Sequence, residues 1–423
     1  MRILEPKRLA VLGAVVLGAG LLAACVPPPP PPPPPTMVDD DGQAAPGDCD
    51  AADTAASTIG AAVSAVASGT HIDVCPGTYA EQLTIPDTKD DITLTSVQSR
   101  AATIKAPPTM AEPGDIIRVN GATGWTISGF VISGPLPNAL FCSVETRAGL
   151  FVAGSGEVTV DDNAFTDIWA TDPSLRGCQN GIAIRVGRHA APTHVGTATI
   201  TNNDFGNYQK AAIVIDGTGS SADVGLNTVT GEGPVNYIAQ NGIQVSRGAV
   251  GNVAGNVVAG HTYSLAPSSS STGILLFQSG AGLIVNNNDV RQNDDNIALF
   301  DTDGITVQQN AVRNSTFFDG LFADSDTSGN QFIGNFADDN QLFDCEDLSI
   351  AVTVPPVANT WTDNIGTTSF PPGICTPPAG GGPTSQGSQS RARAAATCRR
   401  PRVDRLTGRR ARPVQNQPVP LTR

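Results

Sequence analysis

Short stretches of alternating apolar and polar residues recur along most of the 423-residue chain, and β-branched residues dominate them. This alternation indicates half-buried β-strands, and helical periodicity is absent from these stretches. The strands return at intervals of roughly 30 residues, a period typical of solenoid repeats. In the clearest set, an apolar triplet follows Gly149, Gly181, Ala212, Gly242, Gly273, Asn296 and Gly320.

Two further sets of strands interleave with the first. One set precedes an asparagine element and includes residues 158–160 and 305–307. The other set follows Asn163, Asn203, Asn227, Asn256, Asn288 and Asn310. Three strands in each repeat predict an all-β solenoid, in which every coil adds one strand to each of three parallel sheets and successive coils lie about 4.8 Å apart. We expect about ten such coils.

Within the first set, the first and third residues of each triplet are apolar and predict two columns inside the solenoid. The first column contains Leu150, Ile182, Ile213, Ile243, Ile274, Ile297 and Leu321. The second and fourth positions after the repeated glycine then point outward. They place Arg185 beside Asp216, which we interpret as a surface ion pair of little energetic weight. They also place Phe277 beside Phe300, an apolar pair covered either by a loop or by a ligand.

Three longer motifs resemble the right-handed parallel β-helix, or pectin-lyase-like, superfamily. They are IDVCPGTYAEQLTI (72–85), ISGFVIS (127–133) and NTWTDNIGTTSFPPGIC (359–375). The resemblance implies a right-handed parallel β-helix domain, which we bound at residues 49–375. The superfamily contains lyases, hydrolases, esterases, epimerases and binding proteins without activity, so the resemblance specifies the fold and leaves the function open. Residues 51–68 suit a short helix that plugs the first coil.

The segments outside this domain have different compositions. Residues 1–24 have the positive start and apolar run of a signal peptide, and the Leu-Ala-Ala-Cys sequence resembles a bacterial lipobox. This implies a lipid on Cys25, a membrane anchor and an extracytoplasmic location; ordinary secretion is the alternative. Residues 25–48 contain a run of nine consecutive prolines and an acidic stretch, which predict a stalk and a linker. Residues 376–423 read as a disordered linker and a basic tail, either functional or foreign to the rest of the chain.

Charge and cysteine content limit the partners. From Val26 to Ser390 there are 12 Lys and Arg residues and 37 Asp and Glu residues, which gives a net charge of 12 − 37 = −25 and argues against nucleic acid as a partner.

Setting aside Cys25 and the tail Cys398 leaves six cysteines, for which an exported protein favours disulfides. Fifteen connectivities are possible. Proximity along the chain suggests the pairs Cys49–Cys75, Cys142–Cys178 and Cys345–Cys375.

The segment NDDNIALFDTDG (293–304) concentrates carboxylates. Its DDNIAL resembles an element of polygalacturonase-type glycoside hydrolases, but the His and Arg-x-Lys motifs that accompany that element are missing. The repeat instead aligns Asp295 with Asp319, at positions where Asn-Gly and Asp-Gly suit turns. We therefore interpret both as stacked turn residues. The alternative is a Ca²⁺ site, because like charges one coil apart favour a cation between them.

Aromatic residues gather in the longer coils and predict a ligand site. Flat rings with nearby polar side chains suit a polysaccharide that lies across the coils. The candidate contacts are Trp169, Tyr208, Tyr237, Tyr263, Gln244, Phe277 and Phe300. The alternative is that each ring only holds its own loop in place.

We expect a surface-anchored protein that binds a polysaccharide. The first alternative is a polysaccharide lyase or glycoside hydrolase that uses Arg185, Asp216 and Lys210, although no complete catalytic set is visible in the sequence. The second alternative is a structural or adhesive module without activity.

Overall fold

The structure is a computed structural model that describes residues 36–138, 141–142, 146–266, 269–349 and 358–378. The chain divides into residues 1–33 and residues 34–423, and all described residues belong to the second unit. The predicted signal peptide, the predicted lipid site Cys25, the proline run and the basic tail lie outside the described residues. Within the described ranges, no helix is both long enough and apolar enough to span a bilayer.

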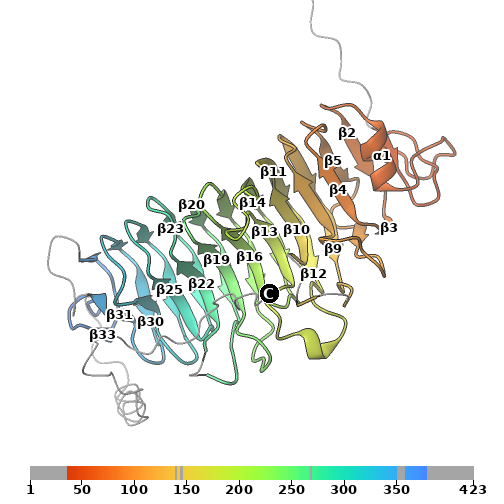
Figure 1. The fold of residues 1–423 in the computed structure, drawn as a ribbon. Coiled ribbons are helices and arrows are strands. Elements are labelled where there is room, and N and C mark those ends of the chain that lie inside the picture. The colour runs from red at the N-terminus through yellow and green to blue at the C-terminus, as the bar shows by residue number, and fades with distance from the viewer. Residues whose placement is uncertain (1–35, 139–140, 143–145, 267–268, 350–357, 379–423) are drawn as a thin grey trace, which may run out of the picture. The chain divides into compact units, whose positions relative to one another are not determined.

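All three sheets are parallel, and their strands alternate along the chain (Figure 1). The first sheet begins at the N-terminal end of the described chain, and 12 of its strands are described. They are β1 (Thr36–Val38), β2 (His71–Val74), β5 (Thr93–Ser96), β8 (Trp125–Ser128), β11 (Gly156–Asp161), β14 (Gly196–Thr201), β17 (Ser221–Gly225), β20 (Val250–Ala254), β23 (Ile284–Asn286), β26 (Thr306–Gln308), β29 (Gln331–Ile333) and β32 (Thr360–Thr362).

The second sheet contains the strands that follow the repeated asparagines, and ten of its strands are described. They are β3 (Gly77–Ala80), β6 (Ala102–Lys105), β9 (Phe130–Ser133), β12 (Ala164–Thr166), β15 (Asp204–Phe205), β18 (Thr228–Thr230), β21 (Val257–Ala259), β24 (Asp289–Arg291), β27 (Ala311–Arg313) and β30 (Phe336–Asp338).

The third sheet contains the apolar triplets, and its described part has 11 strands. They are β4 (Leu83–Pro86), β7 (Ile117–Asn120), β10 (Ala148–Ala153), β13 (Ile182–Val186), β16 (Ala211–Asp216), β19 (Asn241–Ser246), β22 (Thr272–Phe277), β25 (Asp295–Phe300), β28 (Leu321–Ala323), β31 (Cys345–Asp347) and β33 (Ser369–Phe370). The three predicted strand sets thus fall in three separate parallel sheets, and the fold is a right-handed parallel β-helix.

One hydrophobic core runs inside the coils, from Val38 to Cys375. The register pairs Leu150 with Ile184 and then Ile213, so Ile184 and not Ile182 occupies the predicted column. Ile182 instead lies opposite Ala148, outside that core. The alignment by glycine misplaced this coil by two residues, because a strand can shift against a sequence motif without changing its apolar pattern.

The folded domain begins earlier than the predicted boundary at residue 49. β1 pairs in parallel with β2, and the side chains of Met37 and Val38 are buried. β1 has only three residues and is followed by an acidic sequence, so its pattern did not distinguish it from a linker. The predicted helix is the short α1 (Ile59–Ala65), whose residues Ile59 and Val63 are buried at the end of the core.

Eight buried asparagines form a ladder at one edge of the second sheet. Each Nδ2 group donates to a carbonyl of the preceding coil. Each Oδ1 atom accepts from the backbone and side chain of the asparagine one coil earlier, as Asn256 does for Asn227, except that Oδ1 of the first member, Asn163, accepts from the backbone N–H of Phe130. The ladder consists of Asn163, Asn203, Asn227, Asn256, Asn288, Asn310, Asn335 and Asn364.

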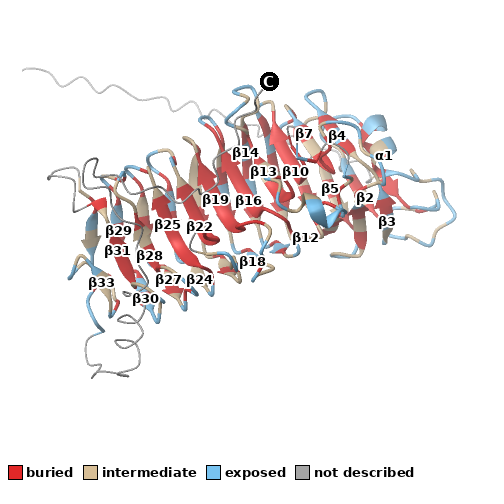
Figure 2. Cartoon of the chain, turned by 60° about the horizontal axis from the view of Figure 1, so that its bottom comes forward, coloured by how far each residue is buried: buried red, intermediate tan, exposed pale blue. Residues whose placement is uncertain are grey.

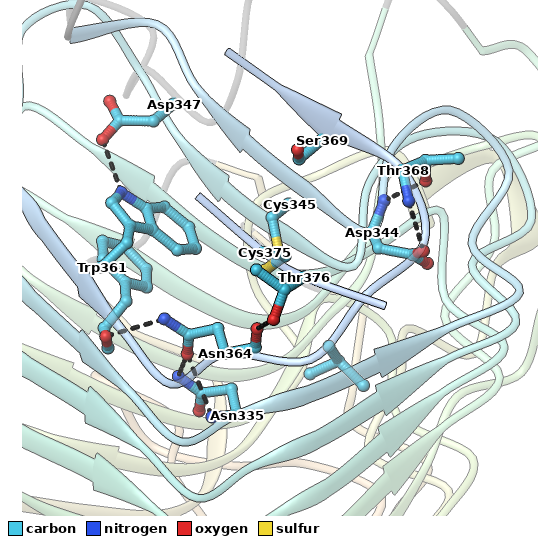
Figure 3. The surroundings of a disulfide bond; sticks show 12 residues. Asn335, Asp344, Cys345, Asp347, Trp361, Asn364, Thr368, Ser369, Cys375 and Thr376 are labelled. Carbon is cyan, nitrogen blue, oxygen red and sulfur yellow. Dashed lines mark hydrogen bonds between the residues drawn. A yellow bond between two sulfur atoms is a disulfide. The ribbon is translucent and has the colours of Figure 1, made fainter. Parts of the chain in front are cut away.

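Three disulfides join Cys49 to Cys75, Cys142 to Cys178 and Cys345 to Cys375, which confirms the predicted pairs. The third lies in the last coils, where the indole Nε1 of Trp361 donates to Asp347 at 2.7 Å (Figure 3). Disulfides form and persist in oxidising compartments, so the domain is extracytoplasmic.

Candidate functional site

The outer face of the 11-stranded sheet carries the predicted catalytic candidates. Phe151 and Ala148 form a hydrophobic cluster separate from the core, so their side chains point away from the interior of the coils. The central strands of this sheet are buried over most of their length (Figure 2). The register aligns one outward row from strand to strand, in the order Arg118, Phe151, Arg185, Val214, Gln244 and Leu275.

Asp216 joins two arginines on this face. Its carboxylate accepts from Nη2 of Arg185 at 2.7 Å and from Nη1 of Arg247 at 3.0 Å. The side chain of Asp216 is 3% exposed, and the two arginine side chains are 13% and 14% exposed. Burial alone raises the pKa of Asp216, but the two guanidinium groups hold this pKa below its ordinary value. The predicted pair is therefore present, but its interpretation as a surface ion pair was wrong, because the carboxylate is buried and shared.

Gln244 belongs to the same hydrogen-bond network. Its Oε1 atom accepts from Nδ2 of Asn241 at 2.9 Å, and its Nε2 group donates to Oγ of Ser246 at 3.1 Å. The Ser246 hydroxyl in turn donates to Asp216 at 3.0 Å. Gln244 thus connects Asn241 with Ser246 along one strand. These hydrogen bonds hold the side chains of this face in a fixed arrangement.

A third arginine lies two strands before Arg185. Nη2 of Arg118 lies 3.0 Å from the carboxylate of Asp115, and the guanidinium carbon lies 4.5 Å from the ring centre of Phe151. Burial raises the pKa of Asp115 to about 6, although Arg118 acts to lower it. Three arginines on one face distinguish this region from the otherwise acidic domain.

The predicted pair Phe277 and Phe300 lies in register on β22 and β25. Both side chains are half-buried and contact other groups of the chain. The guanidinium carbon of Arg247 lies 5.3 Å from the ring centre of Phe277, and the ring of Phe322 lies 5.3 Å from that of Phe300. The first contact is between a cation and a ring, and the second is between two rings.

Carboxyl groups occupy the last coils of the same face. Asp295 is the first residue of β25 and is 5% exposed, so its interpretation as a turn residue was wrong. Its Oδ2 atom accepts from Ser270 at 2.8 Å. Burial raises the pKa of Asp295 to about 7. Burial also raises the pKa of Asp319 well above its ordinary value, and Glu346, whose carboxyl is hydrogen bonded to Asp319, adds to this effect.

The four predicted loop rings have different environments. Tyr208 is 1% exposed inside the core, and its hydroxyl is hydrogen bonded to Nε2 of His261. It therefore does not contact a ligand on the surface, and this prediction was wrong. Tyr263 is half-buried, and its backbone N–H donates to Asp294 at 2.7 Å.

Trp169 and Tyr237 lie on loops from different coils and meet through an arginine that sequence reasoning did not select. The guanidinium carbon of Arg176 lies 4.4 Å from the Trp169 ring centre and 5.9 Å from that of Tyr237. All three side chains are half-buried. A loop arginine without a motif around it gives no sequence signal, and only the fold brings it between the rings.

Lys210 precedes β16 and is 4% exposed. Its Nζ group donates to the carbonyl of Ala239 at 2.6 Å. Burial lowers its pKa to about 7, so the amine loses its proton near neutral pH. The catalytic role considered for Lys210 stays a prediction, because the amine is buried against the carbonyl of Ala239.

No set of carboxylates in the described residues has the spacing of a metal centre. The one group of potential ligands with close spacing among them is Asp39 with Cys49 and Cys75, and these two sulfurs form a disulfide. Asp295 and Asp319, the alternative Ca²⁺ ligands, accept hydrogen bonds from the backbone N–H groups of Asp319 and Phe343 at 3.3 and 2.9 Å, and their binding of Ca²⁺ stays a prediction.

No family model and no curated protein sequence matches the chain. Similar solved structures include XylC in complex with xylose, at 12% identity and a TM-score of 0.45 over 72% of this chain and 69% of that one. The periplasmic alginate epimerase AlgG follows at 14% identity and a TM-score of 0.39, over 66% and 64%. The pectin methylesterase from Aspergillus niger has 15% identity and a TM-score of 0.35, over 72% and 86%. Likeness at this level carries no argument about activity, and the fold assignment rests on the three parallel sheets.

Proposed function

We propose that the outer face of the 11-stranded sheet binds an acidic polysaccharide. The observation that supports this most directly is the position of Arg118, Arg185 and Arg247 on one face of a domain whose charge is otherwise strongly negative. Cations concentrated on one face of an acidic protein attract and orient an anionic chain while the remaining surface repels it.

The geometry of the arginines suits carboxylate groups. Asp216 is one carboxylate shared by Arg185 and Arg247, so this cluster has one more positive than negative charge. A guanidinium group has five N–H donors in a fixed plane; Nε of Arg185 donates to the carbonyl of Gly187, and the donors that neither this carbonyl nor Asp216 uses would bind a sugar carboxylate. The half-buried ring of Phe277 lies close to Arg247 and offers apolar surface to the sugar ring.

Binding to polygalacturonate and to neutral dextran, measured by titration calorimetry at low and high salt, tests the proposal. We expect binding to polygalacturonate alone, with an affinity that falls as salt screens the charges. Arg247→Gln should weaken binding about tenfold, the equivalent of one charge-assisted contact. Arg291→Gln is the matched control, because Arg291 pairs with Asp289 on the second sheet. Equal binding of dextran and polygalacturonate would overturn the proposal.

The lyase alternative retains one specific observation, the Lys210 amine with a pKa near 7. A lyase base removes the proton next to the uronate carboxylate, the bond to the leaving sugar oxygen breaks, and this oxygen takes up a proton. The product has a new double bond and absorbs in the ultraviolet. Absorbance that increases with polygalacturonate and disappears in Lys210→Met would establish this reaction. Binding without absorbance would leave the protein a binder.

The expected lipid on Cys25 and the proline stalk complete the proposal, because they would display the domain outside the cell. Detergent partitioning of the expressed full-length chain tests this, and Cys25→Ala should move the protein from the detergent phase to the aqueous phase. Equal partitioning of both proteins would exclude the anchor.

A further inference from the structure

Arg176 lies between two aromatic rings on the loop from β12 to β13, which projects beside β12 in yellow-green (Figure 1). Its guanidinium carbon lies 4.4 Å from the ring centre of Trp169 on the same loop. Tyr237, on the loop from β18 to β19, provides the second ring at 5.9 Å. Contact of a ring with the face of a guanidinium group does not use the N–H donors in its plane. Of these donors, Nε of Arg176 is buried and one N–H is hydrogen bonded to the Tyr237 hydroxyl, and the others remain for a ligand.

This loop is fixed on both sides of Arg176. Cys178 is bound to Cys142, two residues after the arginine. Gln209, which is 0% exposed, donates through Nε2 to the carbonyls of Leu175 and Cys178 at 3.1 and 2.9 Å. The position of the guanidinium group is therefore established before any ligand arrives, and a receptor that is fixed in advance loses little entropy on binding.

The charge of Arg176 has no counterion within the described residues. None of the ion pairs formed there includes Arg176, and its Nε atom is buried without a hydrogen-bond partner. Its polar contact is with the hydroxyl of Tyr237, and that hydroxyl donates to Glu232. A buried donor without a partner destabilises the folded state, so a ligand that supplies an acceptor is favoured at this position.

We propose that Arg176, Trp169 and Tyr237 form a subsite for an anionic group on a sugar, either a carboxylate or a sulfate. The guanidinium group binds the anion with two parallel hydrogen bonds. The edges of Trp169 and Tyr237 contact the sugar ring. This subsite rests on the proposed binding of an acidic polysaccharide and extends it beyond the sheet to the loops.

The competing explanation is that Arg176 only ties the two loops together. Arg176→Lys distinguishes the two roles, because lysine keeps the charge but loses the planar donors and the stacking. If Arg176 only ties the loops together, replacing it changes the melting temperature, and the protein that remains folded binds the ligand with the affinity of wild type. If Arg176 belongs to a subsite, both Arg176→Lys and Arg176→Gln bind the ligand more weakly than wild type, although the same fraction of each protein is folded.

The experiment titrates full-length protein with galacturonate monomer, oligogalacturonate and heparin fragments, and records the fluorescence of Trp169 as the difference between wild type and Trp169→Phe. We expect a saturable Trp169 signal with the monomer, and an affinity for oligogalacturonate about tenfold lower in Arg176→Gln than in wild type or Arg291→Gln. A response to heparin fragments alone would identify the anion as sulfate.

The outcomes separate this subsite from the proposed function. If oligogalacturonate binds and Arg176→Gln binds it equally well, the subsite is wrong and the proposed function stands. If the chain binds no acidic oligosaccharide but the monomer changes the Trp169 signal in an Arg176-dependent way, the proposed function fails and the subsite stands. No Trp169 response to any of the three probes overturns the subsite.

Discussion

The carboxyl groups of Asp319 and Glu346 are hydrogen bonded to each other on the outer face of the 11-stranded sheet. Both side chains are 2% exposed. A hydrogen bond between two carboxyl groups requires a proton on one of them, and burial favours the neutral form. Asp295 lies one strand away, with its pKa raised to about 7. Neutral carboxyl groups thus stabilise these coils where repulsion between three carboxylates would destabilise them.

The first prediction is that raising the pH destabilises these coils. The folded-state pKa values of Asp295 and Asp319 lie above the ordinary value, so their contribution to stability is complete below about pH 4. The contribution of Asp295 is lost as the pH rises through about 7, and that of Asp319 is lost as the pH rises through its own raised pKa. Asp295→Asn/Asp319→Asn should remove this part of the pH dependence and melt at a higher temperature than wild type at pH 8. Melting temperatures of wild type and the double mutant, recorded from pH 4 to pH 8, measure this pH dependence.

The control for this prediction is Asp339→Asn/Asp363→Asn, which changes two exposed carboxylates of the same region. Its pH profile should parallel that of wild type. A double mutant of the buried pair with the wild-type profile would contradict the assignment of neutral carboxyl groups.

The second prediction concerns calcium. Both Asp295 and Asp319 already accept backbone hydrogen bonds, and we expect equal melting temperatures in EDTA and in millimolar Ca²⁺ at matched ionic strength. A bound cation would instead raise the free energy of unfolding by about 2.7 kcal/mol at a hundredfold excess over Kd. A Ca²⁺-specific shift that disappears in Asp295→Asn/Asp319→Asn would show that these residues bind the cation.

The fold could be predicted because its signals repeat. Each of the three strand sets recurs in many coils, so an error in one coil, such as the misplaced Ile182, left the sheet assignment intact. The disulfides followed from proximity along the chain. β1 was missed because three residues carry too little pattern to distinguish a strand from a linker.

The site could be predicted only in part, because burial and contacts across coils leave no local signal. Arg185 and Asp216 were paired correctly, but Arg247 is a third member that no spacing rule suggested. Tyr208 has the same local sequence character as a surface ring but lies inside the core. The exposure of a single aromatic residue depends on the path of its loop, which the repeat does not encode.

The third prediction concerns the asparagine ladder. Asn256→Ala removes the acceptor of the Asn227 backbone N–H and side chain, and it leaves the carbonyl of Val224 without its donor. Each buried group that loses its partner has a cost of about 1–3 kcal/mol. We therefore expect a loss of several kcal/mol in unfolding free energy by denaturant titration. Asn236→Ala, at an exposed position, should change it by less than about 0.5 kcal/mol.

The fourth prediction concerns the buried pair of Tyr208 and His261. Tyr208→Phe removes the hydroxyl that bonds to Nε2 of His261, which is 0% exposed, and should lower the unfolding free energy by about 1–3 kcal/mol. Tyr263→Phe, at a half-buried loop position, is the control and should be nearly neutral. Denaturant titration of both variants at pH 7 measures the difference, and equal stability of the two would contradict a core role for Tyr208.

The fifth prediction concerns Asp216, whose loss leaves Arg185 and Arg247 without their shared carboxylate. Asp216→Asn keeps the shape and removes the charge, and breaking a buried pair in this way lowers stability by about 3–5 kcal/mol. The folded-state pKa of Asp216 lies below its ordinary value, so its contribution is present above about pH 4 and is lost as the pH falls through the folded-state pKa. The difference in unfolding free energy between wild type and Asp216→Asn should thus be full at pH 7 and shrink in strong acid. A difference that does not depend on pH would mean that shape, and not charge, makes Asp216 important.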